Sequence, residues 1–152
     1  MSTQMQAVAL GLLVARGAAQ LGQANCKCLG AVTDELQAAY VDCAAPDYPM
    51  AVDGKCLKST HFETQGYNWT HFAGDYGRTC KKHVEYQSSS CVALGSFPPQ
   101  EKVTGKATWC DDPWCYVDQC NCEAPDLKKS DYFEDVAPSL WYSYATCQAS
   151  NN

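Results

Sequence analysis

The chain has 152 residues, a formal net charge of −6 and 11 cysteines. This length suits one domain, or two at most, and the negative charge argues against a nucleic-acid partner. So many thiols are typical of a chain that matures in an oxidising compartment, because spare cysteines in the cytosol oxidise or capture metals.

The N-terminal part of the chain is apolar. A run from Ala7 to Ala15 is followed by small residues, as in a signal peptide that is cleaved after Ala19 or Ala24. The run is too short to span a bilayer. Because no Lys or Arg precedes it, a retained apolar helix stays open as the alternative. We expect residues 1–24 to form this N-terminal segment and residues 25–152 to form a single cysteine-rich domain.

Three stretches predict local structure. Residues 33–43, TDELQAAYVDC, predict a helix with Thr33 as its N-cap. Residues 130–135, SDYFED, predict a single helical turn capped by Ser130. The alternating, aromatic-rich LWYSYATC predicts a strand that ends at Cys147. Gly, Pro and Asn punctuate the rest, so we expect a small, irregular, disulfide-rich α+β domain with short strands and one or two short helices.

The cysteine spacing favours disulfides over a metal or redox site. No C-x-x-C occurs, so the usual dithiol redox motif and the usual zinc knuckle are both missing, although non-local metal ligation stays possible in principle. Within each C-x-C the side chains lie on the same face of an extended strand, so each should pair with a distant partner. The odd count predicts five disulfides and one thiol that is free or bonded to another chain. The disulfide candidates are Cys26, Cys28, Cys43, Cys56, Cys80, Cys91, Cys110, Cys115, Cys120, Cys122 and Cys147.

The cysteine-rich half of the chain carries a resemblance. The pattern YGRTC, WCDDPWCYVDQCNC and YSYATC, within residues 74–147, resembles a cysteine-rich module of algae and other protists, especially dinoflagellates and stramenopiles. The chain has Gln119 where a proline is common in that module, and His83 near the place of a Trp-Asp pair. The resemblance implies an exported, membrane-attached or lumenal protein, and it implies no particular activity.

No catalytic motif is present. The three histidines lie outside any metal-binding or catalytic pattern, and the sequence has no G-x-S-x-G, Walker, G-x-G-x-x-G or H-E-x-x-H motif. The adjacent Asp111 and Asp112 could act as paired carboxylates, but neighbouring aspartates usually form a solvated loop. We predict that the chain is not an enzyme and uses no cofactor, and a small secreted hydrolase is the least favoured class.

Two surface features suit binding. The stretch GYNWTHFAGDYG holds four aromatic residues, which could stack on a glycan or, as we favour, pack against disulfides. Asn68 begins the only N-x-S/T sequon and is a glycosylation candidate. Between Asp111 and Asp135 there are eight acids against Lys128 and Lys129. A basic partner or a calcium ion could use this charge, but the absence of EF-hand spacing favours a solvated region.

These features lead to one expected function and one alternative. We expect a non-catalytic structural or accessory subunit that docks on the oxidising, lumenal or extracellular side of a larger membrane-bound assembly. An algal photosystem at the thylakoid lumen is a concrete example. Its partners would be protein subunits and, through the apolar run, a membrane surface. The alternative is a secreted or cell-surface glycan-binding module. The expected contact residues are Val8, Leu12, Leu13, Trp69 and Trp114.

Overall fold

A computed structural model describes residues 22–31, 33–43, 51–67, 70–86, 88–93 and 100–149. The expected contact residues Val8, Leu12, Leu13 and Trp69 and the glycosylation candidate Asn68 lie outside the described residues. In chain order the elements are β1 (Gly22–Gln23), β2 (Cys26–Lys27), α2 (Asp34–Gln37), β3 (Tyr40–Asp42), β4 (Lys55–Lys58), α3 (Thr60–Thr64), β5 (His71–Ala73), β6 (Val92–Ala93), β7 (Gln100–Glu101), η1 (Thr108–Asp111), β8 (Cys115–Val117), η2 (Gln119–Asn121), β9 (Lys128–Lys129), β10 (Trp141–Ser143) and η3 (Ala145–Cys147).

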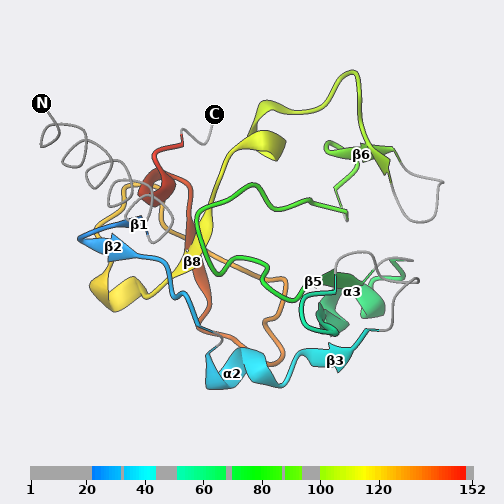
Figure 1. Cartoon of the computed structure of the whole chain (residues 1–152), viewed down its shortest axis with the longest axis horizontal. Helices are drawn as coiled ribbons and strands as arrows, with labels where there is room; N and C mark the ends of the chain where they lie inside the picture. Colours follow the sequence, from blue (N-terminus) through cyan, green and yellow to red (C-terminus); the bar gives the residue numbers. More distant parts are fainter. Residues whose placement is uncertain are drawn as a thin grey trace, which may run out of the picture.

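The expected fold class is confirmed, because the described elements are two short α-helices and short antiparallel strands held by disulfides. Two sheets have three strands each, in the orders β3-β4-β5 and β8-β10-β9, and the pairs β1-β2 and β6-β7 form two-stranded sheets. In Figure 1 the strands β1 and β2 lie beside β8 and the C-terminal segment drawn in red, whereas α2, α3 and the β3-β4-β5 sheet lie together at the lower edge.

The first predicted helix is shorter than expected. Its N-cap is correct, since the Thr33 side chain accepts a hydrogen bond from Leu36 N at 3.1 Å. The helix ends at Gln37, however, and the chain then enters β3, where Tyr40 pairs with Leu57 of β4. Aromatic and β-branched residues favour a strand once a partner strand is available, so tertiary pairing overrides the helical pattern after two alanines.

Two further expectations at the C-terminal end need correction. The strand predicted to reach Cys147 ends at Ser143, and the chain continues as the 3₁₀ helix η3. The hydroxyl of Ser143 accepts a hydrogen bond from Thr146 N at 3.1 Å, which bends the chain out of the sheet. Residues 130–135 form turns rather than a helix, although the Ser130 hydroxyl does accept from Tyr132 N at 3.4 Å.

Five disulfides connect the described segments, and Cys120 is an exposed free thiol. This arrangement matches the odd cysteine count. Both cysteines of the first C-x-C pair with partners more than 80 residues away, as their geometry predicts. The pairs are Cys26–Cys122, Cys28–Cys115, Cys43–Cys56, Cys80–Cys147 and Cys91–Cys110.

The packed structure includes residues before position 25. Strand β1 pairs with β2, and Gln23 N donates a hydrogen bond to Thr146 Oγ1 at 3.0 Å. Cleavage after Ala24 would therefore remove a strand from the fold, whereas cleavage after Ala19 would leave it in place. Among the described residues, no helix has the length and apolar character needed to cross a membrane.

Candidate functional site: an aromatic pocket

The clearest cavity has a volume of about 430 Å³ and lies against the β8-β10-β9 sheet. Seven of its lining residues are aromatic, and the others are charged or carry a hydroxyl. The lining residues are Tyr76, Glu85, Trp109, Trp114, Tyr116, Lys128, Lys129, Ser130, Asp131, Tyr132, Glu134, Tyr142 and Tyr144. Its size falls within the range of small-molecule sites.

The alternation of side chains along β8 produces one wall of this pocket. Tyr116 points into the aromatic core that borders the cavity, whereas Cys115 and Val117 belong to the sulfur-rich cluster on the opposite face. The backbone of Tyr116 is held on both edges, because its N–H donates to Gly77 O and its carbonyl accepts from Leu29 N. The pocket wall is therefore fixed by backbone hydrogen bonds as well as by a neighbouring disulfide.

The rings around the pocket contact one another edge to face. The Trp114 ring lies 5.0 Å from that of Tyr76, 5.1 Å from that of Tyr116 and 5.7 Å from that of Tyr142 between centroids. Such edge-to-face contacts stabilise aromatic clusters beyond simple burial. The aromatic surface is thus already ordered in the absence of a ligand.

A buried carboxyl group, Glu85, lies at the pocket. The Tyr76 hydroxyl donates to Glu85 Oε1 at 2.7 Å and the Tyr132 hydroxyl donates to Glu85 Oε2 at 3.1 Å. Burial raises the pKa of Glu85 to about 7, although the hydrogen bonds from Tyr76 and Tyr132 act in the opposite direction. This side chain therefore changes its charge near neutral pH. Sequence reasoning missed it, because nothing in HVEY distinguishes a buried acid from a solvated one.

A second polar group at the pocket has no hydrogen-bond partner among the described residues. It is the buried hydroxyl of Tyr116, and Ser130 lies near it without meeting the hydrogen-bond geometry. An unsatisfied buried hydroxyl costs about 1–3 kcal/mol, so it would gain from a ligand that accepts or donates a hydrogen bond. Burial raises the pKa of Tyr116 far above its usual value, so the hydroxyl stays neutral.

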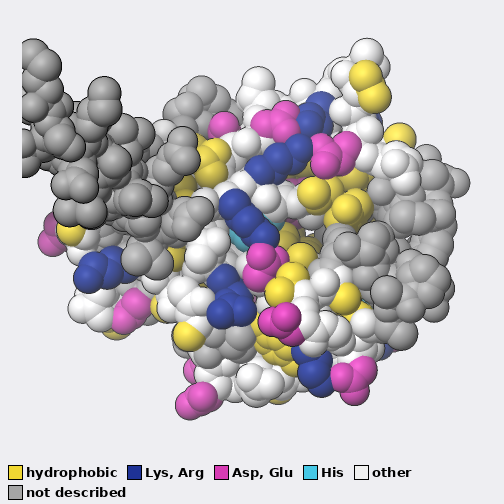
Figure 2. Space-filling model, viewed as in Figure 1, with side chains coloured by type: hydrophobic (Ala, Val, Ile, Leu, Met, Phe, Trp, Pro, Cys, Tyr) yellow, Lys and Arg dark blue, Asp and Glu magenta, His cyan; other side chains and the backbone are white. Residues whose placement is uncertain are grey.

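Charged groups surround the entrance to the pocket. Lys128 and Lys129 on β9 and the nearby Asp131 and Glu134 are all exposed. The face drawn in Figure 2 is likewise mixed, with basic and acidic side chains interspersed among apolar ones. The entrance therefore offers both signs of charge around an aromatic interior.

The aromatic residues singled out in the sequence have different positions. Trp114, one of the expected contact residues, is only 5% exposed; it packs among other rings and lines the pocket. Phe72 and Tyr76 are each 1% exposed, so they are buried as expected, but they pack against other aromatic rings and not against disulfides. Tyr67 is 44% exposed and is the surface aromatic residue among the described members of that stretch.

The histidines do not form a common site in the described part of the chain. His61 Nδ1 lies 3.2 Å from a Glu134 oxygen at the surface. His83 is buried against the rings of Tyr76 and Trp114, and burial lowers its pKa to about 4. His71 lies on β5, where burial lowers its pKa.

The acidic segment between positions 111 and 135 has structural as well as solvated members. Asp126 accepts hydrogen bonds from Ser143 Oγ, Tyr144 N and Ala145 N at 2.6, 2.8 and 2.9 Å, so it fixes the start of η3. Asp111 is exposed and forms an ion pair with Lys106, whose hydrogen bond lowers the pKa of the Asp111 carboxyl. These acids are divided among separate roles, and the aspartates do not gather around one centre.

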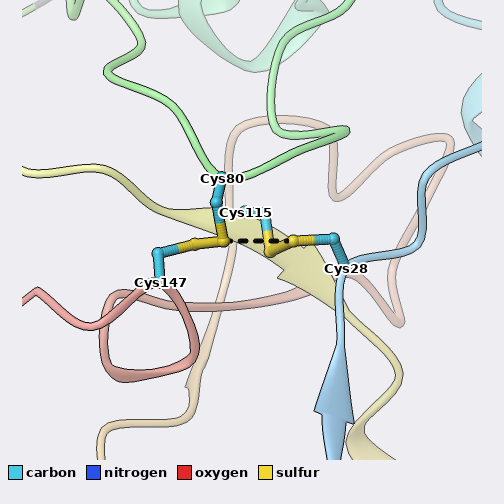
Figure 3. A group of neighbouring side chains, drawn as sticks. All are labelled: Cys28, Cys80, Cys115 and Cys147. Atoms are coloured by element: carbon cyan, nitrogen blue, oxygen red, sulfur yellow. Dashed lines mark hydrogen bonds between the residues drawn. A yellow bond between two sulfur atoms is a disulfide. The ribbon is translucent and has the colours of Figure 1, made fainter. Parts of the chain in front are cut away.

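A second feature lies behind the pocket wall. The disulfides Cys28–Cys115 and Cys80–Cys147 lie next to each other, with Cys28 Sγ and Cys80 Sγ 3.5 Å apart (Figure 3). All four sulfur atoms lie within 4.8 Å of one another. This pair of disulfides joins four separate segments of the chain at one point.

Comparisons with protein families, with curated proteins and with solved structures found no match. The resemblance of residues 74–147 to the algal and protist module therefore stays a prediction. The aromatic pocket and the disulfide framework are the features from which a function can be inferred.

Proposed function

We propose that this chain is a non-catalytic binding module of an oxidising compartment whose aromatic pocket holds a sugar unit of a glycan. The pocket is the main support for this proposal, because it combines ordered aromatic rings with polar groups, Glu85 and the Tyr116 hydroxyl, that could form hydrogen bonds with a ligand. The five disulfides indicate the oxidising compartment.

A sugar has the chemistry that this pocket would recognise. Its C–H faces can pack on the rings of Trp109, which is half-buried, and Tyr142 on β10. Its hydroxyl groups can both donate and accept, so one could satisfy the Tyr116 hydroxyl and another could reach Glu85. The rings and the strand below them are already ordered, which reduces the entropy lost on binding.

The arrangement of carboxyl groups supports binding rather than hydrolysis. Glycoside hydrolysis uses two carboxyl groups that face each other across the scissile bond. Here one acid, Glu85, is buried, whereas the other acids of the pocket, Asp131 and Glu134, are exposed at its entrance. Glu85 also accepts hydrogen bonds from two tyrosines, which suits a structural or binding role.

An accessory subunit of a larger membrane-bound assembly is the second candidate, and the disulfide framework favours it. Three disulfides join residues 67 to 96 positions apart, so much of the ordering entropy is lost at oxidation and not at association. Such a surface suits tight, static contacts with other subunits. If the chain is algal, the lumenal face of a photosystem fits this proposal.

A glycan array tests the first candidate, with two pocket variants and a matched control. Trp109→Ala removes a stacking surface worth about 0.5–1.5 kcal/mol, so we expect binding to fall by about twofold to twelvefold. Tyr116→Phe removes only the unsatisfied hydroxyl and should weaken binding while the protein stays folded. Tyr67→Ala removes an exposed aromatic side chain outside the pocket and should bind as the wild type does.

Three results would count against glycan binding. They are the absence of any bound glycan, unchanged binding by both pocket variants, and hydrolysis of a glycan that stops in Glu85→Gln.

Native mass spectrometry tests the second candidate, the accessory subunit. An accessory subunit should co-purify with large partners, and deletion of residues 1–19 should weaken that attachment while β1 stays in place. A protein that is always monomeric would exclude it.

A further inference from the structure

Four cysteine sulfurs meet in a small volume behind the pocket wall. The Sγ atoms of Cys28, Cys80, Cys115 and Cys147 lie within 4.8 Å of one another, and Figure 3 shows the two disulfides side by side with their sulfurs toward a common point. Cys28 and Cys115 are buried and the other two are half-buried. Among the described residues, which include all eleven cysteines, this is the only such cluster of potential metal ligands.

Backbone hydrogen bonds bring Cys28, Cys80 and Cys115 together independently of the disulfides. Cys28 forms an antiparallel bridge with Val117, two residues after Cys115. Lys81, which follows Cys80, forms a bridge with Trp114, which precedes Cys115. Where these contacts form in the reduced chain, they hold the three cysteines near one another.

Cys147 is held near the same point by its own contacts. Its N–H donates to Tyr144 O at 2.9 Å within η3. The preceding strand β10 pairs with β8, and Ser143 lies opposite Cys115. In the folded protein all four cysteines are therefore also positioned by main-chain contacts, in addition to the two S–S bonds.

We propose that in the reduced chain these four thiolates bind one Zn²⁺ in a tetrahedral site, and that oxidation converts this site into the two disulfides. Zinc bound by four cysteines has Zn–S bonds of about 2.3 Å, so its sulfurs lie about 3.8 Å apart. Between the two disulfides, Cys28 Sγ and Cys80 Sγ are 3.5 Å apart, and no two of the four sulfurs are more than 4.8 Å apart. Within each disulfide the two atoms need only move apart after the S–S bond is broken. Thiolates are soft ligands, which suits zinc better than calcium or magnesium.

Conversion of the zinc site into two disulfides requires one external reactant, an oxidant that accepts the electrons of the four thiolates. A small-molecule disulfide, such as oxidised glutathione, accepts two electrons for each S–S bond formed in the protein. Two such molecules therefore oxidise the four zinc-bound thiolates. The products are two protein disulfides, four small-molecule thiolates and one released Zn²⁺. Zinc would hold the correct four sulfurs together before oxidation and leave once both bonds have formed.

The other cysteines cannot supply a second site of this kind within the described structure. The remaining disulfides, Cys26–Cys122, Cys43–Cys56 and Cys91–Cys110, provide no further group of four sulfurs. The proposal therefore makes a specific assignment among the eleven thiols. It also explains how a zinc site can exist without a C-x-x-C motif, since its ligands come from four distant segments.

Thiol alkylation of the full-length protein tests this assignment. The chain is reduced completely with a phosphine under inert gas, given one equivalent of Zn²⁺, treated with iodoacetamide and mapped by peptide mass spectrometry. We expect Cys28, Cys80, Cys115 and Cys147 to remain unmodified while the other seven cysteines are labelled. Without zinc, all eleven should be labelled. Equal labelling of all eleven cysteines in the presence of zinc, or protection of a different set of cysteines, would overturn the proposal. This holds even if the reduced chain fails to bind zinc because it does not fold.

Cobalt gives an independent readout of the ligands. Co²⁺ in place of Zn²⁺ should bind at one ion per chain with the visible absorption of a tetrahedral four-thiolate site. The double variant Cys80→Ser, Cys147→Ser should lose this spectrum. The matched double variant Cys91→Ser, Cys110→Ser also removes two thiols that pair in the oxidised protein, but it should retain the spectrum. Loss of the spectrum in both variants, or in neither, would contradict the site. Oxidised glutathione added to the zinc form should release one Zn²⁺ per chain, measured with a chromogenic chelator.

Discussion

The ring of Tyr116 packs directly on the backbone of Gly77. A Cβ atom at position 77 would lie 2.2 Å from Tyr116 Cδ2, and Tyr116 N donates to Gly77 O at 2.7 Å. Gly77 also has a backbone φ of +70°, which residues other than glycine rarely adopt. The glycine therefore allows the turn after Tyr76 to approach β8 closely enough to form one wall of the pocket.

Gly77→Ala should consequently destabilise the protein. We expect a loss of about 2–4 kcal/mol, because backbone strain at positive φ adds to overpacking against a buried ring. Gly54→Ala is the matched control, since Gly54 also has a positive φ, of +73°, but nothing lies within 4 Å of its added Cβ. Denaturant unfolding with intact disulfides measures both. Equal losses in the two variants would show that the contact with Tyr116 is unimportant.

The buried pair His83 and Glu85 should produce opposing effects of pH on stability. Glu85 has a pKa raised to about 7 in the folded protein. Its contribution to the free energy of unfolding is therefore complete below pH 4.5 and is lost as the pH rises through 7. His83 has a pKa lowered to about 4, so the folded protein loses stability as pH falls from 6.5 through 4. Each shift corresponds to roughly 3 kcal/mol, so the two slopes nearly cancel between pH 4.5 and 6.5.

Single substitutions should reveal the two slopes. Glu85→Gln leaves the histidine slope, so stability should rise from pH 4 to 6.5 more steeply than in the wild type. His83→Gln leaves the carboxyl slope, so stability should fall between pH 4.5 and 7. The measurement is the difference in unfolding free energy between variant and wild type across this range. If the unfolding free energy of the wild type and both variants changed with pH in the same way, neither Glu85 nor His83 could be a buried group with a shifted pKa.

Asp126→Ala should weaken the C-terminal part of the fold. The carboxylate accepts from one hydroxyl and two backbone N–H groups, and its removal leaves these donors without their partner. We expect a loss of about 1–3 kcal/mol in unfolding free energy. Asp118→Ala provides the comparison, because Asp118 caps the exposed η2 and should cost less. A larger loss at Asp118 than at Asp126 would contradict this ranking.

One cysteine should react in the oxidised protein. Alkylation without reductant should add a single label, at Cys120, because the other ten cysteines are paired. Cys120→Ser should abolish the label and leave the unfolding transition unchanged, since the side chain is exposed. Intact mass and peptide mapping provide the readout. Labels on several cysteines would indicate a different pairing.

The sequence predicts covalent and capping features of this fold better than it predicts strand boundaries. The spacing of Cys26 and Cys28 was sufficient to predict distant partners, because the geometry of a C-x-C is local. The Thr33 cap is local as well, and it is confirmed. The end of the helix after Gln37 depends on pairing with β4, which lies beyond a loop and cannot be seen in the local pattern.

The pocket is harder to predict than the framework for the same reason. Its residues come from separate segments, and Glu85 acquires its character only when Tyr76 and Tyr132 close around it. Trp114 illustrates the limit, because sequence context alone cannot distinguish an exposed ring from one packed in an aromatic cluster. The residues were visible in the sequence, but their common location depends on tertiary structure.

The long sequence separation of three disulfides has a consequence for how the protein is made. Cys26 and Cys28 must wait for partners 96 and 87 residues further along the chain. At ribosomal speeds this delay is on the order of 10 s, during which Cys43 and Cys56 are the nearest available thiols. Wrong bonds formed in that interval must be exchanged later. A production host that oxidises thiols rapidly but isomerises disulfides poorly should therefore yield mispaired protein.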